Sequence, residues 1–142
     1  MIKQHVHIKE YDWDVYAYFA VSEYHVSEIM DRLWDLGCDS STALKAYENL
    51  SSGELDTGLC YSNYGRRQSV MVVALTTSAA QFANSLHHEL VHLQSHIAQV
   101  FHLDPTGEQV AYLSGELIMK LFPRIKHLLC DCCRQEYEYE YE

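Results

Sequence analysis

Basic residues are scarce in this chain of 142 residues, which has 10 Lys and Arg against 20 Asp and Glu and a formal net charge of −10. A protein that binds nucleic acid needs a basic face, because its Lys and Arg side chains replace the counterions of the phosphates. Several of the acids lie in the terminal run EYEYEYE and exaggerate the acidity of the rest. The composition therefore argues against a nucleic-acid partner, and ordinary solubility accounts for the remaining charge.

Long apolar runs are also absent. No stretch approaches the roughly 20 apolar residues needed to cross a bilayer, and the start MIKQHVHIKEYDW lacks the apolar core of a secretory signal. The five cysteines are an odd number, and Cys130, Cys132 and Cys133 crowd together where adjacent residues cannot easily pair. We expect a soluble cytoplasmic protein with no membrane partner and with its cysteines as thiols.

Glycine and proline, at six and two residues, offer few breaks in the chain, and 48% of the residues are hydrophobic. A chain of this length fits one domain with enough apolar side chain for a packed core. We assign residues 1–133 to that domain. The alternating Glu and Tyr residues of 134–142 have no turn and no partner strand, so we expect an acidic, disordered tail there rather than an edge strand.

The spacing of apolar residues predicts both strands and helices. Alternating or continuous β-prone runs indicate strands near 4–10, 14–21, 58–64 and 69–76, the last two as a hairpin. Apolar residues at helical spacing indicate helices over 27–36, 42–50, 79–102 and 108–122. Thr77 or Ser78 can cap the longest helix, and Asp39, Ser40 or Ser41 can cap the second. The predicted fold class is therefore α+β.

The most informative motif is His88-Glu89-Leu90-Val91-His92, an HExxH pattern inside the longest predicted helix. Residues four apart lie on one helix face, so both imidazoles can bind the same zinc ion at about 2.0–2.1 Å. Glu89 lies about 100° around the helix from His88, where its carboxylate can take a proton from metal-bound water. The opposite face carries apolar residues that would anchor the helix to a core: Phe82, Leu86, Leu90, Leu93 and Ile97.

A catalytic zinc site needs a third protein ligand and an open fourth position. Ser95 and Ala98 stand where the extended pattern HExxHxxGxxH requires Gly and His, so that class is excluded. Glu108 opens the next predicted helix, and a helix-turn-helix return would carry it over the HExxH face. Glu116, two turns further along the same stripe, is the alternative, as a ligand or as a residue that orients a histidine. Between them lies Tyr112, the candidate electrophile for the oxyanion, although an aromatic on a packed helix is more often part of the core.

The string HHELVHLQSHI, a loop with Asp-Pro, and then EQVAYLSGEL resemble the minimal gluzincin pattern of zinc metallopeptidases, in which a second helix supplies a glutamate ligand. They are also similar to small HExxH proteins of bacterial and prophage genomes. The resemblance spans about residues 57–120 and implies zinc at His88, His92 and Glu108, with Glu89 as the general base. The spacing is shorter than in thermolysin-like peptidases, and their long accessory domain is absent.

We therefore expect a zincin-like α+β domain, with a small, mostly antiparallel sheet packed against the long HExxH helix and a following Glu-bearing helix. The expected activity is cleavage of a peptide or protein substrate by zinc-activated water, with Zn²⁺ as the cofactor. The alternative is a catalytically silent zinc-binding module with a regulatory or interaction role, of phage or mobile-element origin. Glu89 favours the enzyme, because a purely structural site needs no base. The run 69–76 could offer a sheet edge to an extended peptide. Its unbroken apolar character also suits an interior strand, and the two alternatives are about equal.

Overall fold

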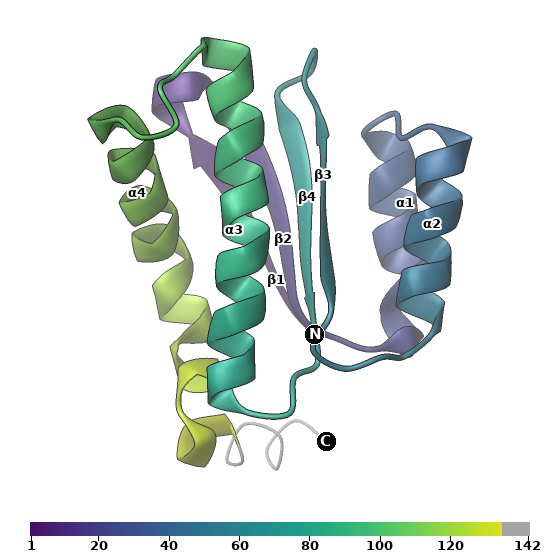
Figure 1. Ribbon diagram of the computed structural model, residues 1–142. Helices are drawn as coiled ribbons and strands as arrows, with labels where there is room; N and C mark the ends of the chain where they lie inside the picture. Colours follow the sequence, from purple (N-terminus) through teal and green to yellow (C-terminus); the bar gives the residue numbers. More distant parts are fainter. Residues whose placement is uncertain (135–142) are drawn as a thin grey trace.

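The computed structural model describes residues 1–134, and residues 135–142 of the predicted tail lie outside the described part. A four-stranded sheet forms the middle layer, with two helices on each face (Figure 1). The strands are β1 (Ile2–Ile8), β2 (Trp13–Val21), β3 (Gly58–Asn63) and β4 (Gln68–Ala74). The helices are α1 (Val26–Asp35), α2 (Ser40–Ser51), α3 (Ala79–Phe101) and α4 (Glu108–Ile125), with short 3-10 turns at Lys9–Tyr11, Glu23–His25 and Lys126–Leu129. The prediction of an α+β fold is confirmed.

The strand order is β1-β2-β4-β3, in which the central pair β2–β4 is parallel and the two outer pairs are antiparallel. The expectation of a mostly antiparallel sheet therefore holds for the outer pairs and is wrong for the centre. A parallel pair needs a long crossover, which α1, α2 and β3 provide. Because β4 is an interior strand, the interpretation of residues 69–76 as an edge is wrong, and the edge strand beside α3 is β3.

The long helix α3 packs its predicted apolar face on the sheet. Its residues Phe82, Leu86, Leu90, Leu93 and Ile97 are at most 3% exposed. They form one cluster with apolar side chains of β1, β2, β4 and α4. Complete burial of one such side chain is worth about 1.5–3 kcal/mol, so this face fixes which side of α3 points away from the core.

The other face of the sheet is covered by α1 and α2 (Figure 1). Ile29 and Leu33 of α1 pack there with Val72 of β4, whereas the next residue, Val73, belongs to the cluster under α3. Burial on both faces explains the unbroken apolar run of β4. Within residues 1–134, no helix has both the length and the apolar composition that crossing a bilayer requires.

The predicted helix caps are confirmed. The Ser78 hydroxyl accepts a hydrogen bond from the backbone N–H of Gln81 at 3.1 Å at the start of α3. The Asp39 carboxylate accepts one from the backbone N–H of Thr42 at 3.0 Å at the start of α2. Each cap supplies an acceptor for an N–H that the helix itself leaves unpaired, which is typically worth about 1 kcal/mol.

The helix α4 continues through Pro123 to Ile125, beyond the predicted end at residue 122. Proline lacks a backbone N–H, so its presence costs the helix a hydrogen bond. The side chains of Ile125 and Leu128 are nevertheless buried in the cluster under α3. We attribute the continuation to this burial, which holds the last turn of α4 against the core.

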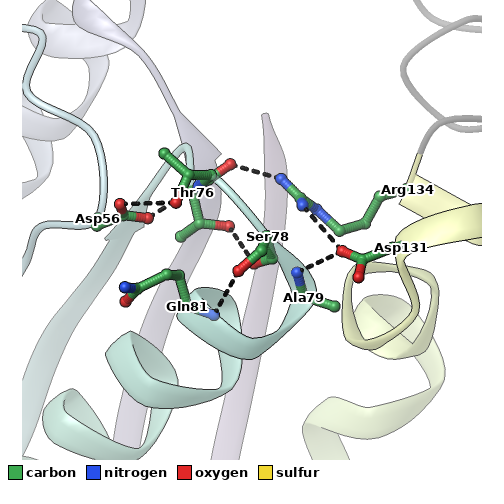
Figure 2. Close-up of polar contacts among 8 residues, drawn as sticks. Asp56, Thr76, Ser78, Ala79, Gln81, Asp131 and Arg134 are labelled. Atoms are coloured by element: carbon green, nitrogen blue, oxygen red, sulfur yellow. Dashed lines mark hydrogen bonds and ion pairs between the residues drawn. The ribbon is translucent and has the colours of Figure 1, made fainter.

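The C-terminal turn holds the loop that leads from β4 into α3. The Asp131 carboxylate accepts a hydrogen bond from the backbone N–H of Ala79 at 2.8 Å, and the Arg134 guanidinium donates to the carbonyl oxygen of Thr76 (Figure 2). Arg134 therefore packs with the folded domain, one residue beyond the predicted boundary at 133. The first residue of the HExxH helix is thus fixed by a segment about 50 positions away in sequence.

Replacing Leu93 with Ala should lower the free energy of unfolding by about 2–5 kcal/mol, because Leu93 is fully buried and its removal leaves a cavity. The measurement is urea denaturation followed by circular dichroism. Val91→Ala is the matched control on the same helix, since Val91 is 40% exposed, and it should change the stability by about 0.5 kcal/mol or less. Similar losses in the two variants would contradict the observed orientation of α3.

Candidate metal centre

Two histidines of the HExxH pattern lie side by side on one face of α3. The ring centroids of His88 and His92 are 4.9 Å apart, with an angle of 70° between the ring planes. The helix produces this spacing, because residues four apart are separated by about 6 Å along its axis. Both side chains are exposed, so the imidazoles are accessible to an ion or to a molecule from solvent.

The carboxylate between them is buried, unlike the histidines. Glu89 is 5% exposed, and its Oε1 atom lies 3.9 Å from Nε2 of His88. Burial raises the pKa of Glu89, and the nearby His88 opposes this shift. A carboxylate withdrawn from water is more basic than an exposed one, which suits it to accept a proton.

A small pocket of about 170 Å³ opens at Glu89. It is lined by Asp56, Thr57, Gly58, Asn84, Ser85, His88 and Glu89. A water molecule occupies about 30 Å³ in the liquid, so the pocket has room for several waters or a small polar group. The Asp56 carboxylate at its rim accepts hydrogen bonds from the backbone N–H of Thr77 at 2.9 Å and from its hydroxyl at 3.0 Å (Figure 2). Two acids from different segments therefore share this pocket with one of the two histidines.

Gly58, the first residue of β3, allows Glu89 to lie directly against the edge strand. A Cβ atom at this position would lie 2.5 Å from the carbonyl oxygen of Val72 and 3.1 Å from Cγ and Oε1 of Glu89. Sequence reasoning missed both Gly58 and Asp56 as site residues. The available signal was the glycine itself, because a glycine within a strand often marks a close approach of another group.

The next part of β3 is joined to α3 by a chain of polar side chains. The Ser62 hydroxyl lies 2.7 Å from Nδ1 of His96 and 2.6 Å from the Ser69 hydroxyl, which accepts a hydrogen bond from Nε1 of Trp13 at 2.8 Å. Burial lowers the pKa of His96, and the neighbouring His92 adds to this effect. The third histidine of the helical stripe is therefore engaged with the sheet.

The predicted third ligands lie on α4, on the other side of α3. The helix α4 packs along β1, where Lys120 donates to the carbonyl oxygen of His7 at 3.0 Å and pairs with Glu116 at 3.0 Å. Glu89 and His96, in contrast, contact β3 at the opposite edge of the sheet. The structure therefore places Glu116 beside β1 and not beside the two histidines.

Glu108 is exposed in the first turn of α4. Helix α3 ends at Phe101, about 14 Å along the axis beyond His92, and the return into α4 begins only there. Within residues 1–134, no three His, Cys, Asp or Glu side chains are arranged to hold one metal ion. The structure thus brings together His88, Glu89 and His92 and does not bring Glu108 to them.

Tyr112, the predicted electrophile, is 73% exposed on α4. It is neither part of the core nor part of the pocket at Glu89. Its neighbours on the exposed side of α4 include Met119 and Phe122, which are 69% and 48% exposed. The expectation of a packed aromatic is wrong here, because the buried stripe of α4 runs instead through Leu113, Leu117 and Leu121.

The residues that the structure assembles fit part of a zinc site. Two imidazoles one helical turn apart are suitable nitrogen donors, and a buried carboxylate stands beside the first of them. The donor set lacks a third ligand in the described residues. No protein-family model, no curated protein and no solved structure matches the chain, so the site is interpreted from its own geometry.

Proposed function

We propose that the protein is a zinc-dependent hydrolase, and specifically a metallopeptidase. The observation that carries the proposal is the buried Glu89 carboxylate, whose Oε1 lies 3.9 Å from Nε2 of His88 on a helix that also presents His92 on the same face. A carboxylate is costly to bury, and the side chain beside it that could carry a positive charge is His88. A purely structural pair of histidines would need no such group.

The roles of the side chains follow from this arrangement. His88 and His92 would hold the ion, which when bound supplies a water of lowered pKa and a Lewis acid for the substrate carbonyl. Glu89 Oε1 accepts a proton from a water in the pocket, and burial makes this oxygen the more basic. The same oxygen then donates the proton to the leaving amine. Gly58 keeps Glu89 in position, because no side chain separates the carboxylate from the edge strand.

The free edge of β3 supports a peptide as the substrate. The carbonyl oxygen of Gly58 accepts a hydrogen bond from Nδ2 of Asn49 at 3.3 Å, so it points away from β4. In an antiparallel pair, alternate residues direct their backbone groups to the outside, and Cys60 and Ser62 share this orientation with Gly58. An extended peptide could pair with the outward backbone groups of Cys60 and Ser62 and pass beside Glu89.

The third ligand is proposed from the residues that could reach the histidines. Asp56 lines the same pocket as His88 and Glu89, and its carboxylate is held by a single residue, Thr77. Either acid would have to move to bind the ion, because no three such side chains in residues 1–134 surround one metal position. Asp56 would turn its carboxylate away from Thr77, whereas Glu108 would need the first turn of α4 to move toward the pocket. A carboxylate from either segment would complete a set of two nitrogen donors and one oxygen donor, leaving a position for water.

Purified protein should carry about one zinc per chain, measured by elemental analysis without added metal. His88→Ala and His92→Ala should lose it, because each removes a nitrogen donor. His87→Ala is the matched control, since His87 is exposed on the same helix but next to the stripe, and it should retain the metal. Full zinc content in the His88 and His92 variants would contradict the proposed site.

The same measurement identifies the third ligand. Asp56→Asn, Glu108→Ala and Glu116→Ala are compared with the wild type, and we expect the loss of zinc in only one of them. Loss in Asp56→Asn assigns the ligand to the pocket, whereas loss in Glu108→Ala requires that α4 moves. Retention in all three would show that none of these acids is needed for zinc binding.

Glu89→Gln should retain zinc and lose about 10²–10⁴-fold in the rate of peptide cleavage, because glutamine cannot accept the proton. Activity is measured with a library of internally quenched peptides and zinc by elemental analysis of the same sample. An unchanged rate would contradict the role of Glu89. Zinc binding with no activity in the wild type would favour the silent zinc-binding module.

Gly58→Ala should lower the free energy of unfolding by about 1–3 kcal/mol, because the new methyl group meets the Val72 carbonyl and Glu89. It should also reduce activity, since Glu89 must move away from the edge strand. Gly115→Ala is the control, because a Cβ there would meet nothing within 4 Å and alanine favours a helix by up to about 1 kcal/mol. Thermal denaturation of both variants gives the comparison, and equal stability of the Gly58 variant and the wild type would contradict the predicted clash.

A further inference from the structure

Two cysteines in the C-terminal turn have the spacing of a redox dithiol. Cys130 follows the 3-10 turn Lys126–Leu129 with extended backbone angles, φ −139° and ψ 124°, and the residues from 131 to 134 form a helical turn. Cys133 therefore lies one turn after Cys130, in the pattern Cys-x-x-Cys. The site shares no residue with the candidate metal centre, so it does not depend on the proposed hydrolase activity.

The backbone N–H of Arg134 donates to the carbonyl oxygen of Cys130 at 2.9 Å, which closes a helical turn and places Cys130 and Cys133, three residues apart, on the same side of it. Hydrogen bonding from Cys133, and then from the backbone N–H of Cys132, lowers the pKa of the Cys130 thiol. The arrangement stabilises a thiolate, which is the reactive form of cysteine.

The turn that carries this pair is anchored to the domain. Asp131, between the two cysteines, accepts a hydrogen bond from the backbone N–H of Ala79, and Arg134 donates to the carbonyl oxygen of Thr76 (Figure 2). These contacts hold the backbone on both sides of Cys133. The two thiols are thereby kept close together while Cys130 itself is exposed and reachable by a small molecule.

We propose that Cys130 and Cys133 form a redox-active dithiol that a low-molecular-weight disulfide oxidises to an intramolecular disulfide. The Cys130 thiolate attacks one sulfur of glutathione disulfide, so that a mixed disulfide forms and one glutathione leaves with the proton that Cys130 gave up. The Cys133 thiol then loses its proton and attacks the sulfur of Cys130, releasing the second glutathione. The dithiol loses two electrons, and glutathione disulfide gains them.

Cys132 provides the internal control. It is exposed like Cys130, but it is adjacent in sequence to Cys133, and neighbouring residues cannot easily form a disulfide. Cys38 and Cys60 are withdrawn from solvent, and burial raises the pKa of each thiol, so they should react slowly. A reagent in solution should therefore distinguish Cys130 from every other cysteine of the chain.

The experiment treats the full chain with glutathione disulfide in the presence of EDTA, blocks the remaining thiols with an alkylating reagent, and maps the products by mass spectrometry. We expect the wild type to lose two thiols and to gain no glutathione. Cys133→Ser should retain glutathione on Cys130, because the resolving thiol is missing, whereas Cys132→Ser should behave as the wild type does. Cys130→Ser should gain little glutathione and form no disulfide.

A stable adduct on Cys130 in the wild type, or a requirement for Cys132, would overturn the proposal. A second measurement needs no variant: limited alkylation of the native wild type at pH 7 should modify Cys130 at least several-fold faster than Cys132. Equal rates at the two exposed positions would also overturn it. Circular dichroism of each variant verifies that the fold is retained, so a loss of reaction is not a loss of structure.

Discussion

The burial of one face of α3 against the sheet is the constraint on which the candidate site depends. Each residue advances about 100° around the helix, so once Leu86, Leu90 and Leu93 are buried, the direction of every other side chain follows. His88 and His92 are then exposed on one face, and Glu89 is directed toward β3. The motif contributes the chemistry, but its orientation comes from apolar residues that take no part in that chemistry.

Burying the Glu89 carboxylate costs free energy, and the residues of the edge strand β3 next to it accommodate the buried group. Gly58 removes the side chain that would otherwise occupy the space of the carboxylate. Cys60 is the next residue of β3 on the same side. Burial and the charge of Glu89 raise the pKa of its thiol, so the thiol stays protonated and does not add a second negative charge. Further along, the Ser62 hydroxyl is a hydrogen-bond partner of His96, and the Ser69 hydroxyl accepts a hydrogen bond from Trp13. This second part of the strip between α3 and β3 is thus polar but paired, which is the condition under which polar groups are tolerated in an interior.

The sequence predicted those features of the fold that depend on residues close to one another along the chain. The helix of the motif, its buried face and the Ser78 cap follow from period and local hydrogen bonding, and the structure agrees with them. The order of the strands does not follow from such signals, because β2 and β4 are apolar on both faces and period alone does not say which partner each will take. The side of α3 on which α4 packs is equally non-local. A six-residue connection permits either side, and burial of Leu113, Leu117 and Leu121 beside β1 decides it. The sequence therefore does not determine on which side of α3 Glu108 and Tyr112 lie.

The position of α3 along its axis is controlled separately from its rotation. Apolar burial sets the rotation, and polar contacts at the first turn add a constraint along the axis. Asp56 holds the residue before the cap, and Asp131 holds the first N–H of the helix, from opposite sides of the loop (Figure 2). Both are carboxylates near a helix N-terminus, where the partial positive charge of the unpaired N–H groups favours them. Asp56 also lines the pocket at Glu89. The contact that holds the start of α3 therefore lies close to the place where the position of α3 along its axis determines the distance between Glu89 and the edge strand β3.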